Sequence, residues 1–449
     1  MAFTGGYTFK HFEGAAEPVL RDIPLPERIT VSFRDTAPIP RRLLVEAGAS
    51  IRAGEPLFTE GDDECVFPSP VGGAVEKAGD EGIAVRSDGD PSYIPVSGHP
   101  RAPWHMDRAS ALKVFRTSGC SLLFEGRFVD PATLDSIRHI IVNAVHNAPL
   151  DREWKPNAFG DTDLFHDGIR TLKTLFPGSD ITIATNRRNR VFFECPEIAR
   201  DQVFLRIASD RYPQEFPDLL SRDIHGVKPG TLDPSVLVAP FEEIIQASEC
   251  MTRGRPLIDR IILVAGPGVS KPGWYRIRIG TPFAHISRHL LKAEEFGPWR
   301  IIRGGILTGM GVSSCDEELR CSDHEITVIR EHASRDLYRF LNPGFAYDSY
   351  ARVTMSTWLP ILKRRLDSSV HGGVRPCVQC NFCDEVCPVG IYPHLIWKQV
   401  AAGLVEETFR LKPHRCVGCG LCDYVCPSKI DISRAVRSAR AEYLKGKMT

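Results

Sequence analysis

The sequence contains no long apolar run and no excess of charge of either sign. Among its 449 residues, 56 Lys and Arg balance 56 Asp and Glu, so no global field attracts nucleic acid or anionic lipid. No stretch approaches the roughly 18 consecutive apolar residues that span a bilayer, and residues 1–14 lack the apolar core of a secretory signal. We therefore expect no nucleic-acid partner, no transmembrane segment in the chain itself and no export.

Several catalytic signatures are missing as well. Neither the P-loop pattern G-x4-G-K-[ST] nor the hydrolase pattern G-x-S-x-G occurs. The nearest glycine clusters, Gly266-Pro267-Gly268 and Gly304-Gly305, suit turns better than a loop that holds nucleotide phosphates. These absences argue against P-loop nucleotide hydrolysis and against hydrolysis by an activated serine.

The cysteines, by contrast, are numerous and unevenly placed. Eight of the 14 lie between Cys377 and Cys426, and the other six are scattered over the preceding residues. Crowded thiols in a long chain without a secretory signal are typical of metal ligands rather than of a disulfide framework. The expected compartment is the reducing cytosol.

These eight cysteines form two copies of one motif. Cys377-Val-Gln-Cys380-Asn-Phe-Cys383-Asp-Glu-Val-Cys387-Pro is echoed by Cys416-Val-Gly-Cys419-Gly-Leu-Cys422-Asp-Tyr-Val-Cys426-Pro. Both copies have the spacing of bacterial-type [4Fe–4S] ferredoxins, in which the fourth cysteine ligates the other cluster. By analogy with those ferredoxins, one cluster is assigned to Cys377, Cys380, Cys383 and Cys426, and the other to Cys416, Cys419, Cys422 and Cys387. Full ligation leaves no open iron, so we expect electron transfer and predict no catalytic residue.

Zinc is the alternative metal for such cysteines. A structural zinc ion needs only two C-x2-C pairs. This region has more: two sets of four cysteines, each followed by proline. The charge balance also favours clusters, because residues 361–449 carry a net charge of +6 and two thiolate-ligated clusters contribute about −4. A solvated helix face explains the same basic residues equally well.

The pattern along the chain predicts both β and α/β regions. Short apolar runs between turn residues predict strands at 43–45, 56–58, 71–75 and 82–85. Strands at 139–144 and 180–184 flank a helical pattern at 164–176, which is typical of a βαβ unit. A β-rich segment opens at 260–266, and helices are expected at 359–366 and 393–409.

Several segments resemble known redox proteins. Residues 142–150 (VNAVHNAPL), 225–231 (HGVKPGT), 264–272 (VAGPGVSKP) and 304–309 (GGILTG) resemble the A subunit of the sodium-translocating NADH:quinone reductase (Nqr), and the resemblance spans most of residues 30–360. The C-terminal dicluster, with residues 389–393 and 428–430, resembles the C subunit of the related Rnf ferredoxin:NAD oxidoreductase.

The resemblance implies an α/β plus β fold with four domains. Residues 1–103 are expected to form a lipoyl-like or barrel-sandwich-like β domain, although its carrier lysine is missing, and 104–255 a Rossmann-like α/β core. Residues 256–333 are expected to form a β-grasp (SLBB-like) domain, and 334–449 a helical domain with two [4Fe–4S] clusters.

The function implied is that of an iron–sulfur electron-transfer subunit in an Nqr/Rnf-type NADH or ferredoxin:quinone oxidoreductase. Its partners would be the other subunits of a membrane-associated complex and a flavoprotein or ferredoxin, and its location the cytoplasmic face of the membrane. A quinone is an additional ligand that the resemblance allows. Two alternatives stay open: a soluble iron–sulfur adaptor that docks a flavoprotein or hydrogenase module, and an FMN-containing NADH dehydrogenase subunit.

The sequence departs from both relatives in ways that bear on the cofactors. FMN is not expected, because the glycine-rich loop is missing and His146 and Asn147 stand where flavin-bearing relatives place acidic residues. The usual Nqr A subunit, in turn, has no clusters. His225, beside Gly226, is a further candidate that could contact a quinone or an anion, although a lone loop histidine is more often a surface or packing residue.

Overall fold

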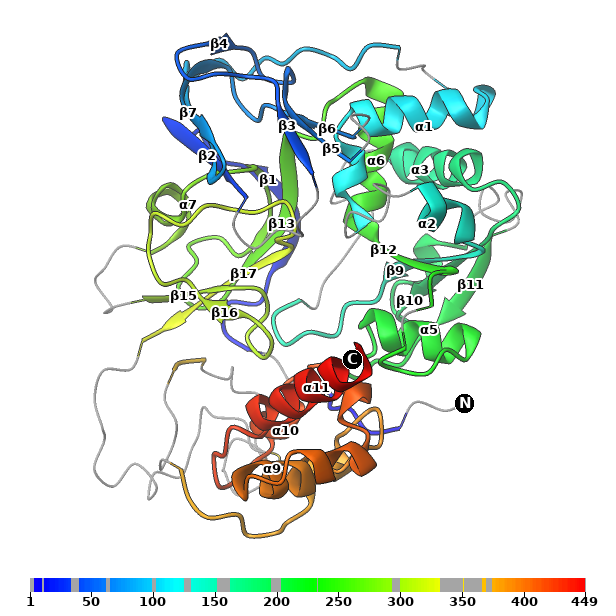
Figure 1. Cartoon of the computed structure of the whole chain (residues 1–449), viewed down its shortest axis with the longest axis vertical. Helices are drawn as coiled ribbons and strands as arrows, with labels where there is room; N and C mark the ends of the chain where they lie inside the picture. Colours follow the sequence, from blue (N-terminus) through cyan, green and yellow to red (C-terminus); the bar gives the residue numbers. More distant parts are fainter. Residues whose placement is uncertain are drawn as a thin grey trace.

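The computed structural model describes residues 4–9, 12–33, 40–61, 65–98, 102–124, 131–151, 162–194, 203–231, 233–292, 299–331, 350, 366–368 and 374–448. It is a mixed α/β structure in which four sheets lie above a helical C-terminal region (Figure 1). One buried apolar cluster runs from the N-terminal sheets through the centre to the C-terminal helices. None of the helices within these ranges is both long and apolar enough to cross a membrane.

The N-terminal part contains two small antiparallel sheets. The first has the order β2 (Arg28–Ser32), β8 (Gly82–Ser87), β7 (Gly73–Gly79), β4 (Ser50–Ile51), and the second has the order β3 (Arg41–Leu43), β5 (Pro56–Glu60), β6 (Cys65–Pro68). Ile29, Leu57, Ile83 and Val85 are completely buried and belong to the central apolar cluster. The strands predicted at 56–58 and 82–85 are confirmed. The strand predicted at 71–75 begins two residues later, at Gly73, and the one predicted at 43–45 is misplaced, because β3 ends at Leu43.

A four-stranded parallel sheet follows. Its order is β11 (Phe204–Ile207), β10 (Asp180–Thr185), β9 (His139–Ala144), β12 (Val236–Pro240). The helices of this part are α1 (Arg108–Thr117), α2 (Pro131–Ser136), α3 (Thr162–Leu175), α5 (Pro217–His225) and α6 (Phe241–Arg253). The strands predicted at 139–144 and 180–184 and the helix predicted at 164–176 are therefore confirmed.

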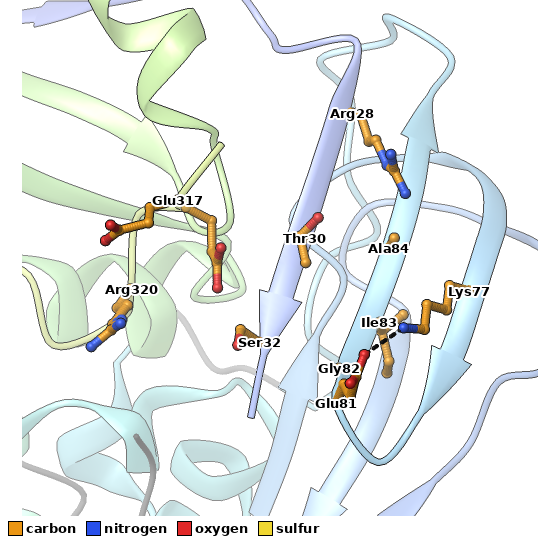
Figure 2. Close-up of a pocket in the computed structure, with 11 residues that line it drawn as sticks. Arg28, Thr30, Ser32, Lys77, Glu81, Gly82, Ile83, Ala84, Glu317 and Arg320 are labelled. Atoms are coloured by element: carbon orange, nitrogen blue, oxygen red, sulfur yellow. Dashed lines mark hydrogen bonds and ion pairs between the residues drawn. The ribbon is translucent and has the colours of Figure 1, made fainter. Parts of the chain in front are cut away.

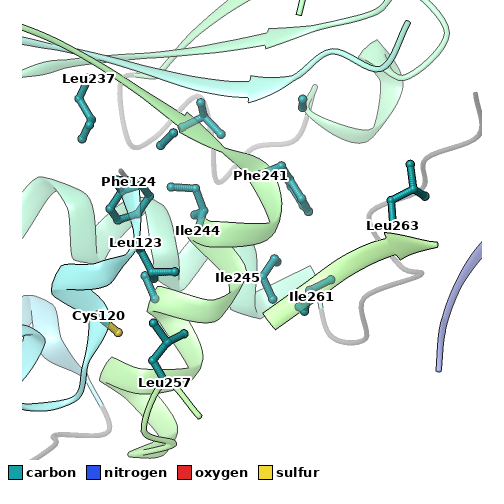
Figure 3. Close-up of a cluster of buried hydrophobic side chains, with 14 of the residues drawn as sticks. Cys120, Leu123, Phe124, Leu237, Phe241, Ile244, Ile245, Leu257, Ile261 and Leu263 are labelled. Carbon is teal, nitrogen blue, oxygen red and sulfur yellow. The ribbon is translucent and has the colours of Figure 1, made fainter. Parts of the chain in front are cut away.

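Helix α6 is buried on several sides, and its side chains link the sheets. Ile244 faces Phe124 and the β12 residue Leu237, whereas Ile245 faces Ile261 of the next sheet (Figure 3). A buried ion pair crosses the same boundary, because the fully buried Arg260 donates from Nη2 to Glu243 Oε1 over 2.6 Å.

The third region is a six-stranded sheet. Its order is β1 (Glu17–Asp22), β14 (Gly273–Arg278), β13 (Asp259–Ala265), β17 (Glu325–Arg330), β15 (Trp299–Arg303), β16 (Met310–Gly311). All seven β13 residues are buried, and α7 (Phe283–Leu290) packs its apolar side on this sheet. Strand β1, from within the predicted N-terminal domain, pairs in parallel with β14 here.

The C-terminal region is helical. It contains the short helices α8 (Phe382–Glu385) and α10 (Leu421–Tyr424) and the longer α9 (Pro393–Ala401) and α11 (Ile432–Met448). The predicted helix over 393–409 is wrong in its second half: α9 ends at Ala401, Gly403 has a left-handed φ of 76°, and a 3₁₀ helix spans Glu406–Leu411. The predicted helix at 359–366 lies outside the described residues except for Leu366.

Candidate functional site

The two cysteine motifs share one backbone shape. Gln379 and Asn381 have left-handed φ values of 55° and 60°, and Gly418 and Gly420, 39 residues further on, have 73° and 75°. Alternation of left-handed with ordinary residues turns successive N–H groups toward one concave side. Such a loop suits the negative sulfurs of a cluster. The first copy adopts it at Gln379 and Asn381, although a non-glycine residue in the left-handed conformation costs about 1 kcal/mol.

Four of the cysteines surround the first cavity, which we call the Cys377 cavity. It is lined, among others, by Cys377, Cys380, Cys383 and Cys426. Three of these cysteines come from the first motif, and the fourth is the last cysteine of the second motif.

The other four line the second cavity, which we call the Cys416 cavity. Its cysteines are Cys387, Cys416, Cys419 and Cys422, with Cys383 at the boundary to the first cavity. The fourth ligand is again exchanged between the motifs. The structure thus brings together the same two sets of four that the sequence predicts.

Burial of these sulfurs disfavours a metal-free thiolate site. Burial and the negative charge of Asp384 raise the pKa of Cys383 to about 12. Burial, Asp423 and three other cysteines raise the pKa of Cys422 well above its usual value. Repulsion between crowded thiolates is relieved by cations, and soft thiolates are the ligands of iron–sulfur clusters. The donor set therefore fits an iron–sulfur cluster in each cavity.

The two copies differ at one position beside the cysteines. His394 lines the Cys377 cavity, and its Nδ1 lies 2.7 Å from Asp384 Oδ2. At the equivalent place in the second copy, Asp423 accepts a 2.8 Å hydrogen bond from the backbone N–H of Ser433. Sequence reasoning missed His394, although aligning the copies 39 residues apart sets it opposite Ser433.

The Cys416 cavity faces the rest of the chain. Tyr212 donates a 2.6 Å hydrogen bond to the carbonyl of Cys419, and Arg222 donates one of 2.6 Å to the carbonyl of Pro388. A Cβ atom on Gly420 would lie 2.3 Å from the carbonyl oxygen of Leu307. The cluster region is therefore closely packed against α5 and against the loop before β16.

Known proteins are similar both to the cluster motif and to most of the chain. A family model described as a 4Fe-4S dicluster domain matches residues 376–430. The A subunit of the Na(+)-translocating NADH-quinone reductase from Yersinia pseudotuberculosis is 23% identical over 406 residues, 87% of each chain. The corresponding protein from Actinobacillus pleuropneumoniae is 27% identical over 371 residues, 80% of each chain. The resemblance to the Nqr A subunit is confirmed.

Among solved structures, a chain of an NAD+-reducing [NiFe]-hydrogenase in the air-oxidized state is 14% identical, with a TM-score of 0.42. The match covers 77% of this chain and 67% of that chain.

Two of the segments that carry the resemblance to the Nqr A subunit contact the cluster region. Leu307 lies in segment 304–309, and Gly230 in segment 225–231 would place a Cβ 2.0 Å from the carbonyl oxygen of His414. Segments that carry this resemblance thus pack directly against the dicluster region.

A polar cavity of about 100 Å³ lies at the carboxyl edge of the parallel sheet. Its lining includes His146 and Asn147 after β9, Asn186 after β10 and Asp210 after β11, and Phe9 from the N-terminal segment. Ligands of open α/β sheets bind at this edge. Sequence reasoning noted His146 and Asn147 only as departures from a flavin site.

A larger cleft of about 540 Å³ separates β2 from the loop at Glu317–Arg320 (Figure 2). Its charges have both signs, and Lys77 pairs with Glu81 over 2.7 Å. None of the site residues predicted from the sequence lines this cleft, and we assign it no ligand. His225 is not a loop residue: it is the last residue of α5.

Proposed function

We propose that this chain is the iron–sulfur electron-transfer subunit of an Nqr/Rnf-type NADH or ferredoxin:quinone oxidoreductase. It relays single electrons through two [4Fe–4S] clusters between a flavoprotein or ferredoxin and the quinone reaction of its complex. It binds other subunits of that complex at the cytoplasmic face of the membrane. The dicluster match at residues 376–430 and the similarity to the Nqr A subunit support this role.

The observation that carries the proposal is the arrangement of the eight cysteines. We assign one cluster to Cys377, Cys380, Cys383 and Cys426, and the other to Cys387, Cys416, Cys419 and Cys422. Each set lines one cavity, and Cys383 lines both. Adjacent, fully ligated clusters suit electron transfer, because no iron is left open to a substrate.

We further propose that the electron path continues from the Cys416 cavity into the chain. The ring of Tyr424, two residues beyond Cys422, lies 5.1 Å from the ring of Phe9, and Phe9 lines the cavity at the carboxyl edge of the parallel sheet. A small redox molecule in that cavity would be separated from Cys422 by the rings of Tyr424 and Phe9. A quinone is the acceptor in the relatives' printed name.

The sheet orders support the finer domain names. The order β11-β10-β9-β12 is that of strands 3-2-1-4 in a doubly wound Rossmann sheet. The two N-terminal sheets are consistent with a lipoyl-like sandwich, and β13, β14, α7, β15 and β17 with a β-grasp domain.

Cysteine variants test the proposal. In anaerobically prepared protein, Cys380→Ser and Cys419→Ser should each remove one of two reduced-cluster EPR signals and leave the other. Cys315→Ser, an exposed cysteine outside both cavities, should keep both. Loss of neither signal in the first two variants would contradict the ligand assignment.

A further inference from the structure

Three metal-binding side chains meet at the opposite, amino edge of the parallel sheet. His139 is the first residue of β9, and Asp180, the first residue of β10, is its direct partner in the strand register. His225 ends α5, and its ring centroid lies 4.2 Å from that of His139. One potential ligand atom from each of the three side chains lies within 4.8 Å of the other two.

The backbone fixes the places of these residues. The N–H of His139 donates to the carbonyl of Ser235 over 3.0 Å, and the N–H of Asp180 donates to the carbonyl of Arg138 over 3.1 Å. Helix α5 ends directly after His225, where Gly226 adopts a left-handed φ of 75°. Two ligands therefore stand on paired strands and the third on a helix end, and ligands on rigid elements form more precise metal sites.

The electrostatics at this edge favour a cation. His225 lies at the C-terminus of α5, where the helix dipole places negative partial charge. The Asp180 carboxylate already lies 2.6 Å from Nδ1 of His139. Burial and the neighbouring His139 lower the pKa of His225.

His225 also has a nitrogen that the protein does not use. Its Nε2 is buried and has no hydrogen-bond partner within the described residues. A buried polar atom without a partner carries a free-energy cost that a ligand would remove. The unpartnered nitrogen is therefore a second observation that points to a ligand, independent of the clustering of the three side chains.

We propose that His139, Asp180 and His225 bind a divalent transition-metal ion of the zinc class. Two imidazoles and one carboxylate are a donor set that zinc accepts, and three protein ligands leave one position for water. This site does not depend on the proposed electron-transfer function, and it lies at the sheet edge opposite the carboxyl-edge cavity.

Metal binding would fix the end of a helix that also contacts the cluster region. Arg222, three residues before His225, donates to the carbonyl of Pro388, which follows the proposed ligand Cys387. A metal ion that links α5 to β9 and β10 would therefore restrain the helix that carries Arg222, whose partner Pro388 lines the Cys416 cavity.

Equilibrium dialysis of the cluster-loaded full chain against micromolar zinc tests the site, with zinc and iron measured in the same sample. We expect about one zinc ion per chain without loss of iron. His225→Ala and Asp180→Asn should weaken zinc binding at least about tenfold while keeping the iron content and the thermal unfolding midpoint of the zinc-free protein.

His289→Ala is the matched control. His289 and His285 form another close histidine pair, with ring centroids 4.5 Å apart, and that pair belongs to no three-ligand group among the described residues. This variant should bind zinc like the unsubstituted chain. Absence of zinc binding in the unsubstituted chain, or equal binding in His225→Ala, overturns the proposal. His225→Gln, which keeps a polar side chain, replaces the alanine variant if that variant does not fold.

Discussion

Tyr212 donates its phenolic hydrogen to the backbone carbonyl of Cys419 over 2.6 Å. Tyr212 is only 3% exposed, and burial raises its pKa well above the usual value, so it remains a donor at every relevant pH. A residue just before α5 is thus bonded directly to a proposed cluster ligand. The N-terminal segment joins the same contact, because Tyr7 forms an isolated antiparallel bridge with Tyr212.

Replacement of this hydroxyl should loosen the cluster region. Tyr212→Phe leaves the carbonyl of Cys419 without its donor, which costs about 1–3 kcal/mol for a buried group. The expected result is a lower thermal unfolding midpoint and faster loss of iron to a chelator. Tyr392→Phe, at an exposed tyrosine, should change neither. Equal rates of iron loss in the two variants would show that the hydrogen bond does not support the cluster loop.

Variants of two glycines in the second motif distinguish the effect of backbone strain from the effect of close packing. Both have left-handed φ values, but a Cβ on Gly418 meets nothing within 4 Å, whereas one on Gly420 lies 2.3 Å from the carbonyl oxygen of Leu307. Gly418→Ala should therefore lose only about 1–2 kcal/mol, and Gln379 at the equivalent position shows that a side chain is tolerated there. Gly420→Ala should lose clearly more, as measured by the unfolding midpoint of cluster-loaded protein. A similar loss in both would mean that the Leu307 loop does not press on the motif.

The buried pair of Arg260 and Glu243 should be important for stability. Arg260→Ala leaves Glu243, whose side chain is 3% exposed, without its cation, and breaking such a pair costs about 3–5 kcal/mol. Arg410→Ala is the control, since its pair with Glu407 is largely exposed and is worth at most about 1 kcal/mol. Chemical denaturation of both variants measures the difference, and equal midpoints would contradict the burial argument.

The acid Glu325 should make stability depend on pH. Burial and the nearby Asp151 raise its pKa to about 7 in the folded chain, against about 4.3 when unfolded. The folded state therefore holds an extra proton between these values, and this contribution to stability is lost as the pH rises through 7. Glu325→Gln removes the titration. From pH of about 5.5 to about 8, the unsubstituted chain should lose about 2 kcal/mol more than this variant; parallel pH profiles would contradict the assignment.

Sequence patterns predicted the local features well. The cysteine spacing gave the two sets of four, and the apolar runs gave β9, β10 and α3, because these signals lie within a few residues of one another. The end of α9 was missed although Gly403 was visible in the sequence, since one glycine inside a helical pattern does not always end it.

Long-range contacts could not be predicted in this way. The pairing of β1 with β14 joins residues more than 250 positions apart, and the meeting of His139 with Asp180 depends on a strand register that no local pattern fixes. The contacts of Tyr212 and Leu307 with the second motif depend likewise on how separate regions pack. The resemblance to the Nqr A subunit drew attention to segments 225–231 and 304–309, but it did not indicate that they contact the cluster region.

Metal analysis of the anaerobically isolated, unsubstituted chain tests the central claim most directly. Iron, acid-labile sulfide and the number of electrons taken up on reduction would be measured on one sample. Two [4Fe–4S] clusters predict about eight iron, about eight sulfide and about two electrons per chain. Zinc in place of iron, or only about four iron that no reconstitution raises, would contradict the claim that the chain conducts electrons through a pair of clusters.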